Sequence, residues 1–351
     1  VRPLSTSALI ITSVLVLTWA ARISKHQLPI ALLLCAAVLL LRNRVPVPAS
    51  RVTIFDVGQG LAALVEHENT RILIDTAGQF ASGTPIAQQT FSNYLVERAR
   101  IKHQDKPVLD LLIVSHEDLD HRGGEDFLRS RLHVKQTLRG EWPDGIHSEV
   151  ADAPVLIGGH LDLFRSLNPN LRQKPGKNQN QTSTDAELCR LGRTMRWPSG
   201  LSLRVLSDPA NTGTRNDRSC VLLLTIQGYR FLFPGDIGSG VERALTAYWR
   251  DELKADVLIA GHHGSASSSS RLWLKWVEPR RFVVSAGYEN AFGHPAAEVL
   301  DRVEPSQATV ISTAERGAIV FDLSEEGDLR CRTLRHRWAP MWRWAAQKDR
   351  C

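Results

Sequence analysis

A predicted strand, Leu109–Val114, runs directly into a loop that is rich in side chains able to bind a metal ion. Residues 115–124 read Ser-His-Glu-Asp-Leu-Asp-His-Arg-Gly-Gly, so two imidazoles and three carboxylates stand within six positions. A hydrolytic metal site needs neutral nitrogen and anionic oxygen donors that converge on the cation and leave one position open for water. The glycine pair lets the backbone turn closely around such donors. The loop therefore predicts four metal ligands: His116, Asp118, Asp120 and His121.

Two later strands end in the same kind of residue. The predicted strand 229–233 is followed by Pro-Gly-Asp236, which places a carboxylate at a strand end where it can bridge two ions. The predicted strand 257–260 is followed by Gly-His262-His263-Gly. Either motif alone is weak evidence, but in series with the histidine-rich loop each predicts a ligand. We expect Asp236 to bridge and His262 or His263 to be the last ligand, with His262 favoured because it lies nearer the strand end.

Beyond Pro46 the chain alternates between short apolar strands and helices, which predicts an α/β class with sheet layers covered by helices. The composition, 43% hydrophobic and 23% charged, is that of an ordinary globular protein and excludes wholesale disorder and a coiled coil. The predicted strands are 52–55, 61–65, 71–75, 109–114, 201–206, 220–226, 229–233, 257–260, 282–285, 309–312 and 318–323, and the predicted helices are 91–100, 240–249, 268–277 and 296–303.

The first 46 residues differ in composition from the remainder. Residues 3–21 carry no charge, and a helix of this length spans roughly 28 Å, close to the hydrocarbon thickness of a bilayer. A second apolar run, residues 30–41, is short for a membrane span. We expect one or two membrane helices here; a signal peptide and a buried helical hairpin are the alternatives. The predicted organisation is a membrane-anchoring segment (1–46), a hydrolase-like domain (47–325) and a basic, Trp-rich tail (326–351).

Charge and cysteine usage set weaker limits on the protein class. The formal net charge of +6 permits a nucleic-acid or anionic-lipid partner without requiring one. In the tail, residues 335–344 interleave cations with three tryptophans. This pattern is typical of single-strand binders and also of an amphipathic tail on a membrane or against the domain, which we favour. Five widely spaced cysteines, with no Cys-x-x-Cys pair, argue against a disulfide scaffold or a cysteine zinc site.

Taken together, the motifs resemble those of the metallo-β-lactamase superfamily. Their sequences are similar to those of the motifs in the hydrolase-like domain of ComEC-type DNA-uptake (competence) proteins. The resemblance covers roughly residues 50–325 and implies an αββα sandwich with one or two divalent ions, Zn²⁺ or Mn²⁺, at its edge. Membrane helices precede this domain in that family. The motifs occur in this order: Asp56-Val-Gly-Gln-Gly60, the loop 115–124, Asn216-Asp-Arg-Ser219, Pro234-Gly-Asp236, His262-His-Gly-Ser265 and Gly293-His-Pro295.

The resemblance also implies a role for each matching residue. Asp75, which closes a predicted strand, matches the aspartate that supports the ligand loop rather than binding metal. Asp118 and Asp120 serve as ligands and, in part, as proton acceptors. His294 is either a phosphate contact or a proton donor, with a purely structural histidine as the alternative.

The third ligand motif departs from the pattern of the wider superfamily. Asn216 stands where that superfamily has a histidine, and an amide is a poor ligand for zinc. Full occupancy of one of the two metal positions is therefore open. Ser219 and Ser265, which close their motifs, are expected to support the site.

The resemblance favours DNA as the substrate, so that the domain is a metal-dependent phosphodiesterase, or nuclease, that degrades the strand not imported. The implied partners are DNA (single-stranded or the non-imported strand), the membrane and other DNA-uptake components. The implied location is the bacterial inner membrane, with the hydrolase domain on its periplasmic side. Two alternatives stay open: a small-molecule hydrolase of esters, lactones or thioesters, and a non-catalytic module of a DNA-uptake channel.

Overall fold

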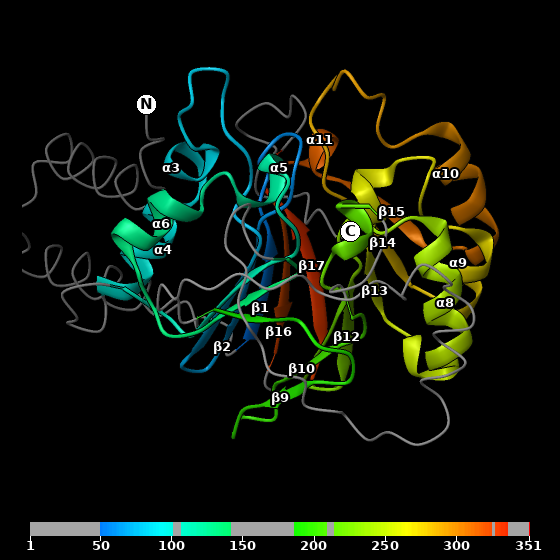
Figure 1. The fold of residues 1–351 in the computed structure, drawn as a ribbon, viewed down its shortest axis with the longest axis horizontal. Coiled ribbons are helices and arrows are strands. Elements are labelled where there is room, and N and C mark those ends of the chain that lie inside the picture. Colours follow the sequence, from blue (N-terminus) through cyan, green and yellow to red (C-terminus); the bar gives the residue numbers. More distant parts are fainter. Residues whose placement is uncertain (1–49, 101–106, 142–185, 209–213, 325–326, 336–350) are drawn as a thin grey trace, which may run out of the picture. The chain divides into compact units, whose positions relative to one another are not determined.

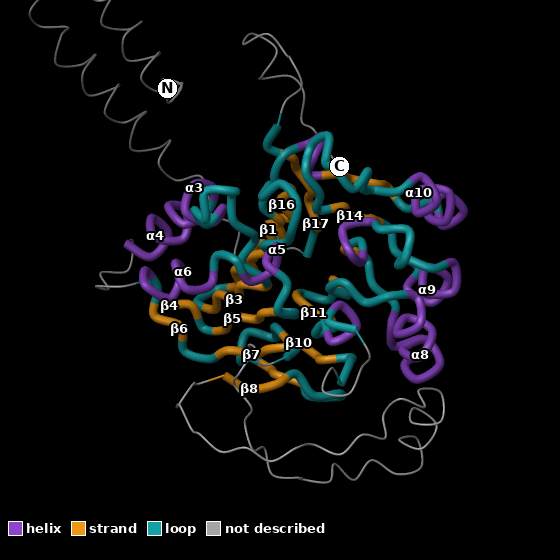
Figure 2. The backbone as a smooth tube through the Cα atoms, turned by 45° about the horizontal axis from the view of Figure 1, so that its top comes forward, coloured by secondary structure: helices purple, strands orange, loops and turns teal. Residues whose placement is uncertain are grey.

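Two β-sheets lie face to face in this protein, and helices cover the outer side of each (Figures 1 and 2). The computed structural model describes residues 50–100, 107–141, 186–208, 214–324, 327–335 and 351. These residues belong to one compact unit, Ala49–Cys351. The four layers form the αββα sandwich that the resemblance implied.

The first sheet has eight strands in the order β17-β16-β1-β2-β3-β5-β7-β8. β1 lies between β2 and β16, with Val52 opposite Val65 on one side and Phe321 on the other. β3 and β5 are parallel, so their carboxyl ends lie at the same edge. The strands are β1 (Ser50–Ile54), β2 (Ala63–His67), β3 (Thr70–Ile74), β5 (Leu111–Val114), β7 (Thr137–Arg139), β8 (Ala186–Leu188), β16 (Ile319–Leu323) and β17 (Leu329–Thr333), and a separate pair joins β4 (Val108–Leu109) to β6 (His133–Val134).

The second sheet has seven strands in the order β15-β14-β13-β12-β11-β10-β9. The pairs from β9 to β12 are antiparallel, whereas those from β12 to β15 are parallel. β12, β13 and β14 therefore end at a common edge. The strands are β9 (Thr194–Arg196), β10 (Ser202–Val205), β11 (Leu222–Ile226), β12 (Tyr229–Phe233), β13 (Val257–Ile259), β14 (Arg281–Val284) and β15 (Thr309–Ser312).

Both faces of the sheets are buried, which explains the continuous apolar runs of the central strands. In β11, Leu222 and Leu224 pack between the sheets, whereas Leu223 packs toward the helices. α8 (Ser239–Trp249), α9 (Arg271–Val277) and α10 (Ala297–Val303) cover the second sheet, and α3 (Ile86–Thr90), α4 (Ser92–Arg100) and α6 (Glu125–Arg131) cover the first. Shorter turns are α5 (Leu119–Arg122), α11 (Thr313–Arg316) and the 3₁₀ segments Asn216–Arg218, Arg250–Leu253, Gly261–Gly264 and Glu304–Ser306.

The domain boundary predicted at residue 325 does not match the sheet. β17 falls within the predicted tail, yet it pairs with β16 along its whole length. Cys331 and Thr333 are buried, whereas Arg330 and Arg332 face the solvent. Because side chains alternate along a strand, arginines that suggested a basic tail are the outward positions of an edge strand. The sandwich therefore extends to Thr333, and residues 336–350 lie outside the described residues.

The expectation of no disulfide framework is wrong for four of the five cysteines. The structure contains the disulfides Cys189–Cys220 and Cys331–Cys351, while Cys35 lies outside the described residues. Cys189 follows β8 of the first sheet and Cys220 precedes β11 of the second, and both are buried. Spacing along the chain gave no sign of this pairing because the two cysteines meet only when the sheets pack. This bond links the two sheets covalently.

Both apolar runs that suggested a membrane anchor lie outside the described residues. Within the part of the chain that the structure describes, no helix has the length and hydropathy that a membrane crossing requires. The anchor at residues 1–46 stays a prediction.

Candidate metal centre

The predicted ligands come from both sheets and meet at the edge where the parallel strands end. β3 leads into Asp75, and its parallel neighbour β5 leads into Ser115 and the ligand loop. In the second sheet, β12 leads into Asp236 and its parallel neighbour β13 leads into His262 and His263. Carboxyl ends of neighbouring parallel strands share one edge, which is where α/β folds build their sites.

Four of the predicted ligands bring their donor atoms within 4.8 Å of one another: Asp120, His121, Asp236 and His263, which we call the four-residue cluster. His121 Nε2 lies 3.0 Å from His263 Nε2 and 3.2 Å from Asp236 Oδ1. His263 Nε2 lies 3.2 Å from Asp120 Oδ2. α5, which carries Asp120 and His121, lies at this edge of the sheets (Figure 2). Two nitrogens and two carboxylates form a donor set that suits a divalent cation.

The hydrogen bonds of the two histidines determine which nitrogen faces the cluster. His263 Nδ1 lies 3.0 Å from the carbonyl oxygen of Ser285, and because a carbonyl only accepts, Nδ1 donates. His121 Nδ1 donates to Asp75 Oδ2 at 2.7 Å. In neutral rings both Nε2 atoms therefore point lone pairs at the same place, which is favourable only when a cation or a proton lies there. Orientation of a ligand ring by a carboxylate or carbonyl is the usual second layer of a metal site.

A second group of donors lies near the other oxygen of Asp236, which is also 3.6 Å from His263 Nε2 of the four-residue cluster. Asp236 Oδ2 lies 3.9 Å from His116 Nε2 and 3.8 Å from His262 Nε2. His116 Nε2 also lies 3.6 Å from Asp118 Oδ2, and it is a buried atom without a hydrogen-bond partner. A buried polar atom left without a partner is costly, so this nitrogen marks a second place where a cation fits. Asp236 thus faces both groups.

The charges of the cluster are mutually dependent. Burial raises the pKa of Asp236, but the positive charges of His121 and His263 outweigh it and hold the pKa well below its usual range. Burial lowers the pKa of His121, but Asp236 and Asp75 raise it well above its usual range. For Asp120, burial raises the pKa, while the hydrogen bond from His263 and the neighbouring histidine charges bring it down to about 2. The carboxylates are therefore ionised at neutral pH.

Asp75, Ser115 and Ser219 hold the ligands without joining either group. Asp75 Oδ1 accepts from the Ser115 backbone N at 2.7 Å, and its Oδ2 accepts from Ser115 Oγ at 2.8 Å. Ser219 Oγ accepts from the backbone N of Asp236 at 3.0 Å and lies 3.3 Å from His116 Nδ1. The supporting roles predicted for Asp75 and Ser219 are consistent with these contacts.

Gly60 allows the ligand loop to pack closely against the rest of the domain. Its φ is +125°, and a Cβ atom there would lie 2.3 Å from the carbonyl oxygen of Asp120. Any side chain at this position would displace the backbone that carries Asp120.

The sequence of this domain matches a known protein family. Residues 55–288, more than half of the chain, match the protein-family model described as the metallo-beta-lactamase superfamily. The chain belongs to the metallo-beta-lactamase superfamily.

Over most of its length, this superfamily member is also similar to curated competence proteins. It is 30% identical to competence protein ComA of Neisseria gonorrhoeae, covering 85% of this chain and 36% of that protein. It is 27% identical to ComE operon protein 3 of Bacillus subtilis (89% and 38%) and 28% identical to Recombination protein 2 of Haemophilus influenzae (89% and 33%). The chain therefore spans about a third of the length of these relatives. The resemblance to ComEC-type proteins is confirmed for this portion.

The preference for His262 over His263 does not match the geometry of this metallo-beta-lactamase domain. Both residues have left-handed backbone conformations, with φ of 49° and 56°. Nearness to the strand end therefore does not determine which ring points inward. His263 is buried in the four-residue cluster, whereas the His262 side chain is 31% exposed and borders the second group.

Two of the remaining predicted residues border the second group, and one does not. Asn216 Nδ2 lies 3.3 Å from His262 Nε2. The ring of His294 lies with its centroid 6.0 Å from that of His262. Ser265 Oγ instead contacts Ser267 Oγ at 3.1 Å, and Ser267 Oγ in turn lies 3.2 Å from His262 Nδ1.

A buried ion-pair network beneath the ligand loop was not predicted from the sequence. Arg139, at the end of β7, donates to Glu117 Oε1 at 2.7 Å and also pairs with Glu125. Burial raises the pKa of Glu117, and the positive charges of Arg139 and Arg122 oppose that rise. The sequence offered one signal: Glu117 is a carboxylate between the predicted ligands His116 and Asp118, yet it belongs to neither donor group. The ion pairs of Arg139 with Glu117 and Glu125 anchor the ligand loop.

Proposed function

We propose that this domain is a divalent-metal-dependent phosphodiesterase that cleaves DNA during DNA uptake. The observation that carries the proposal is the position of Asp236, whose carboxylate lies within 4 Å of donors in both groups: His121 and His263 of the four-residue cluster, and His116 and His262 of the second group. Paired metal positions of this kind are typical of enzymes that cleave phosphodiesters by in-line displacement. The names of the competence relatives favour DNA over other phosphodiesters.

The residues present fit two ions, Zn²⁺ or Mn²⁺, held in unequal positions. One position takes the four-residue cluster. The other takes His116, Asp118 and Asp236, with His262 as the nitrogen donor in place of the missing third-motif histidine. Bound divalent ions would supply Lewis-acid polarisation of the phosphoryl group and a water that ionises near neutral pH.

The side chains around these positions orient the substrate and move protons. The Asp118 side chain is 35% exposed, and the neighbouring His116 imidazole lowers its pKa, so Asp118 is ionised at neutral pH and is able to accept a proton. Burial, together with nearby positive charge, lowers the pKa of His294. It is therefore a neutral ring at pH 7, which favours a hydrogen bond to a phosphate oxygen over proton donation.

We place the domain in an oxidising compartment, on the periplasmic side of the bacterial inner membrane. The two disulfides support this placement because such bonds persist in the periplasm and are rare in the cytosol. A membrane anchor at residues 1–46, and contact with other DNA-uptake components, belong to the same proposal.

The test is a cleavage assay on the full 351-residue chain with single-stranded DNA, repeated with Mn²⁺, Zn²⁺ and Mg²⁺, beside measurement of bound metal. We expect metal-dependent cleavage that Asp236→Asn abolishes and Asp251→Asn, an exposed acid-to-amide control, leaves intact. Hydrolysis of lactone or thioester reporters without DNA cleavage would instead identify a small-molecule hydrolase. Metal binding and DNA binding without any hydrolysis would identify a non-catalytic module.

A further inference from the structure

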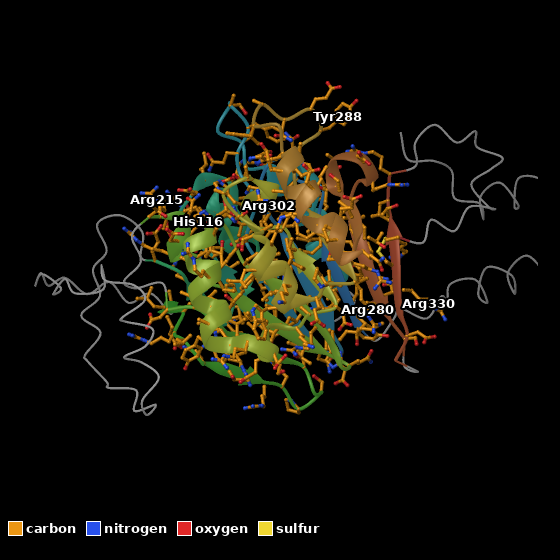
Figure 3. The ribbon with its side chains drawn as sticks, turned by 90° about the vertical axis from the view of Figure 1, so that its right-hand side faces the viewer. His116, Arg215, Arg280, Tyr288, Arg302 and Arg330 are labelled. Atoms are coloured by element: carbon orange, nitrogen blue, oxygen red, sulfur yellow. A yellow bond between two sulfur atoms is a disulfide. The ribbon has the colours of Figure 1, made fainter. Side chains whose placement is uncertain are left out.

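Three aromatic side chains are exposed in the part of the chain that the structure describes, and all three lie on loops beside the metal centre. They are Phe80, Tyr288 and Phe292, which are 42%, 61% and 70% exposed. Figure 3 shows Tyr288 on a loop that projects from the body of the domain. Large apolar side chains that gather at one part of a surface mark a binding site. We call these three residues the aromatic rim.

Both loops of the aromatic rim are attached to the candidate metal centre. The loop that carries Phe80 begins at Gly78, where a Cβ would lie 3.3 Å from the Cα of Asp120. On the other loop, the ring of Phe292 stacks on His294, with centroids 5.7 Å apart and planes at 26°. His294 in turn borders His262, a member of the second donor group. The ring of His294 therefore lies between Phe292 and that group.

Positive side chains also lie beside the ligands. Arg122, Arg215 and Arg218 have side chains that are 45%, 45% and 41% exposed, whereas their partners Glu117 and Glu141 are only 4% and 10% exposed. Guanidinium groups therefore form the accessible part of these pairs. Arg215 also lies 3.4 Å from Asp118, a predicted ligand whose side chain is 35% exposed. Figure 3 shows Arg215 close to His116. Arginine recognises phosphate by paired hydrogen bonds, which suits a polyanionic strand.

We propose that the aromatic rim is a base-stacking site for single-stranded nucleic acid, in which Phe292, backed by His294, stacks on a base beside the phosphate at the metal centre. Every base has an aromatic face, so stacking tolerates any sequence. In a duplex those faces are covered by neighbouring bases, so an exposed ring can receive only an unpaired one. This assignment rests on the proposed phosphodiester substrate and specifies its single-stranded form.

A hollow beside the rim gives room for a further base. Its volume is about 310 Å³, and it opens between Tyr288, His294 and Val310. Leu300 supplies a second apolar wall, and the carboxylate of Glu315 is available to accept a hydrogen bond from an exocyclic amino group. The rim and the hollow together provide stacking surfaces, while the arginines provide phosphate contacts.

The test compares two probes that differ only in their bases. The full chain is titrated with a phosphorothioate oligothymidine, which resists hydrolysis, and with an abasic phosphorothioate strand of equal length and charge. We expect Phe292→Ala to weaken binding of oligothymidine about 10-fold, to leave binding of the abasic strand unchanged, and Phe292→Trp to keep wild-type affinity. Leu272→Ala, which removes another exposed apolar side chain, 43% exposed and on α9, is the control and should change the binding of neither strand.

Equal affinity of the wild-type chain for the two strands, or equal losses for both strands in Phe292→Ala, would overturn the proposal. The proposal would also be overturned if Phe292→Ala bound both strands as the wild type does but lost binding to anionic phospholipid vesicles. The aromatic rim would then be a membrane contact. Base-dependent binding by a chain that never cleaves DNA would support the stacking site while refuting the proposed nuclease, so the two failures are distinguishable.

Discussion

Asp75 Oδ2 accepts a 2.7 Å hydrogen bond from His121 Nδ1, although 46 positions separate the two residues. The bond fixes the His121 ring so that its Nε2 faces Asp236 and His263. Asp75 itself is fully buried and lies on the far side of the ring from the cluster. Asp75 is a positioning residue, and its removal should weaken metal binding through His121, the predicted ligand that it orients.

We expect Asp75→Asn to weaken metal binding 10- to 100-fold, roughly the usual effect of removing the partner of a ligand histidine. The amide can no longer accept in both directions, so the His121 tautomer is no longer fixed. Competition with a fluorescent chelator measures the affinity, and Asp251→Asn is the control for an acid-to-amide change on the surface. Unchanged affinity in a folded Asp75→Asn variant would show that Asp75 does not position the ligand.

Variants of Asp236 and His294 should distinguish a loss of bound metal from a loss of catalytic rate. Asp236→Ala should lose bound metal and all hydrolysis, because this carboxylate faces both donor groups. His294→Ala should keep its metal and lose rate by roughly 10²-fold, the scale of a single positioned hydrogen-bonding group. Mass-spectrometric metal analysis beside the cleavage rate distinguishes them. Metal retained in Asp236→Ala would contradict a bridging role.

The second position should depend on His262 and respond to Asn216. His262→Ala should reduce the metal content from two ions to one, because the four-residue cluster does not include that ring. Asn216→His places a nitrogen donor next to His262 and should tighten the weaker ion and shift preference toward Zn²⁺. Stoichiometry and affinity measured by calorimetry provide the check. If neither variant alters the weaker ion, the second position uses other donors.

The pH dependence should reveal the protonation state of His294. Because burial and nearby positive charge lower the pKa of His294, the ring is neutral at pH 7 and gains a proton only at a pH below the usual pKa of histidine. The rates of wild type and His294→Gln should therefore run parallel between about pH 6.5 and 8.5. A wild-type rate that falls across that range while the variant stays flat would identify a protonated His294 as a general acid.

The Cys189–Cys220 disulfide should stabilise both the fold and the metal centre. Replacing both cysteines with alanine should lower the free energy of unfolding by about 3–4 kcal/mol, from the lost restriction on the unfolded chain. It should also weaken metal binding, because Cys220 follows Ser219, which holds Asp236. The Cys331–Cys351 pair is the matched control, since its removal should cost stability without changing metal affinity. Denaturant unfolding and chelator competition measure the two effects.

The ligands were predictable because their chemistry is local. His116, Asp118, Asp120 and His121 occupy six consecutive positions after a strand, and Asp236 and His263 also follow strands directly. Parallel pairing brings the strand ends of each sheet to one edge, and the packing of the two sheets brings those edges together.

The features that were missed depend on contacts between distant segments. The choice between His262 and His263 depends on two left-handed residues that no periodicity reveals. Arg139 lies on a strand of three residues, too short to show an alternating pattern, so the sequence did not reveal which cation pairs with Glu117. The arginines of β17 alternate with buried residues, which is the pattern of an edge strand. The basic composition of the segment suggests a tail instead, so this strand was missed.

The place of β1 in the first sheet has a consequence for how that sheet folds. β1 pairs on one side with β2, the next strand in the chain, and on the other with β16, a strand far along the chain. Until β16 pairs with it, β1 presents an open strand edge, and such edges can pair with other chains. Contacts of such high sequence separation form slowly. We therefore expect the β1–β2 pair to form before β16 joins it, and the open edge of β1 to be the place where the folding chain is most prone to aggregate.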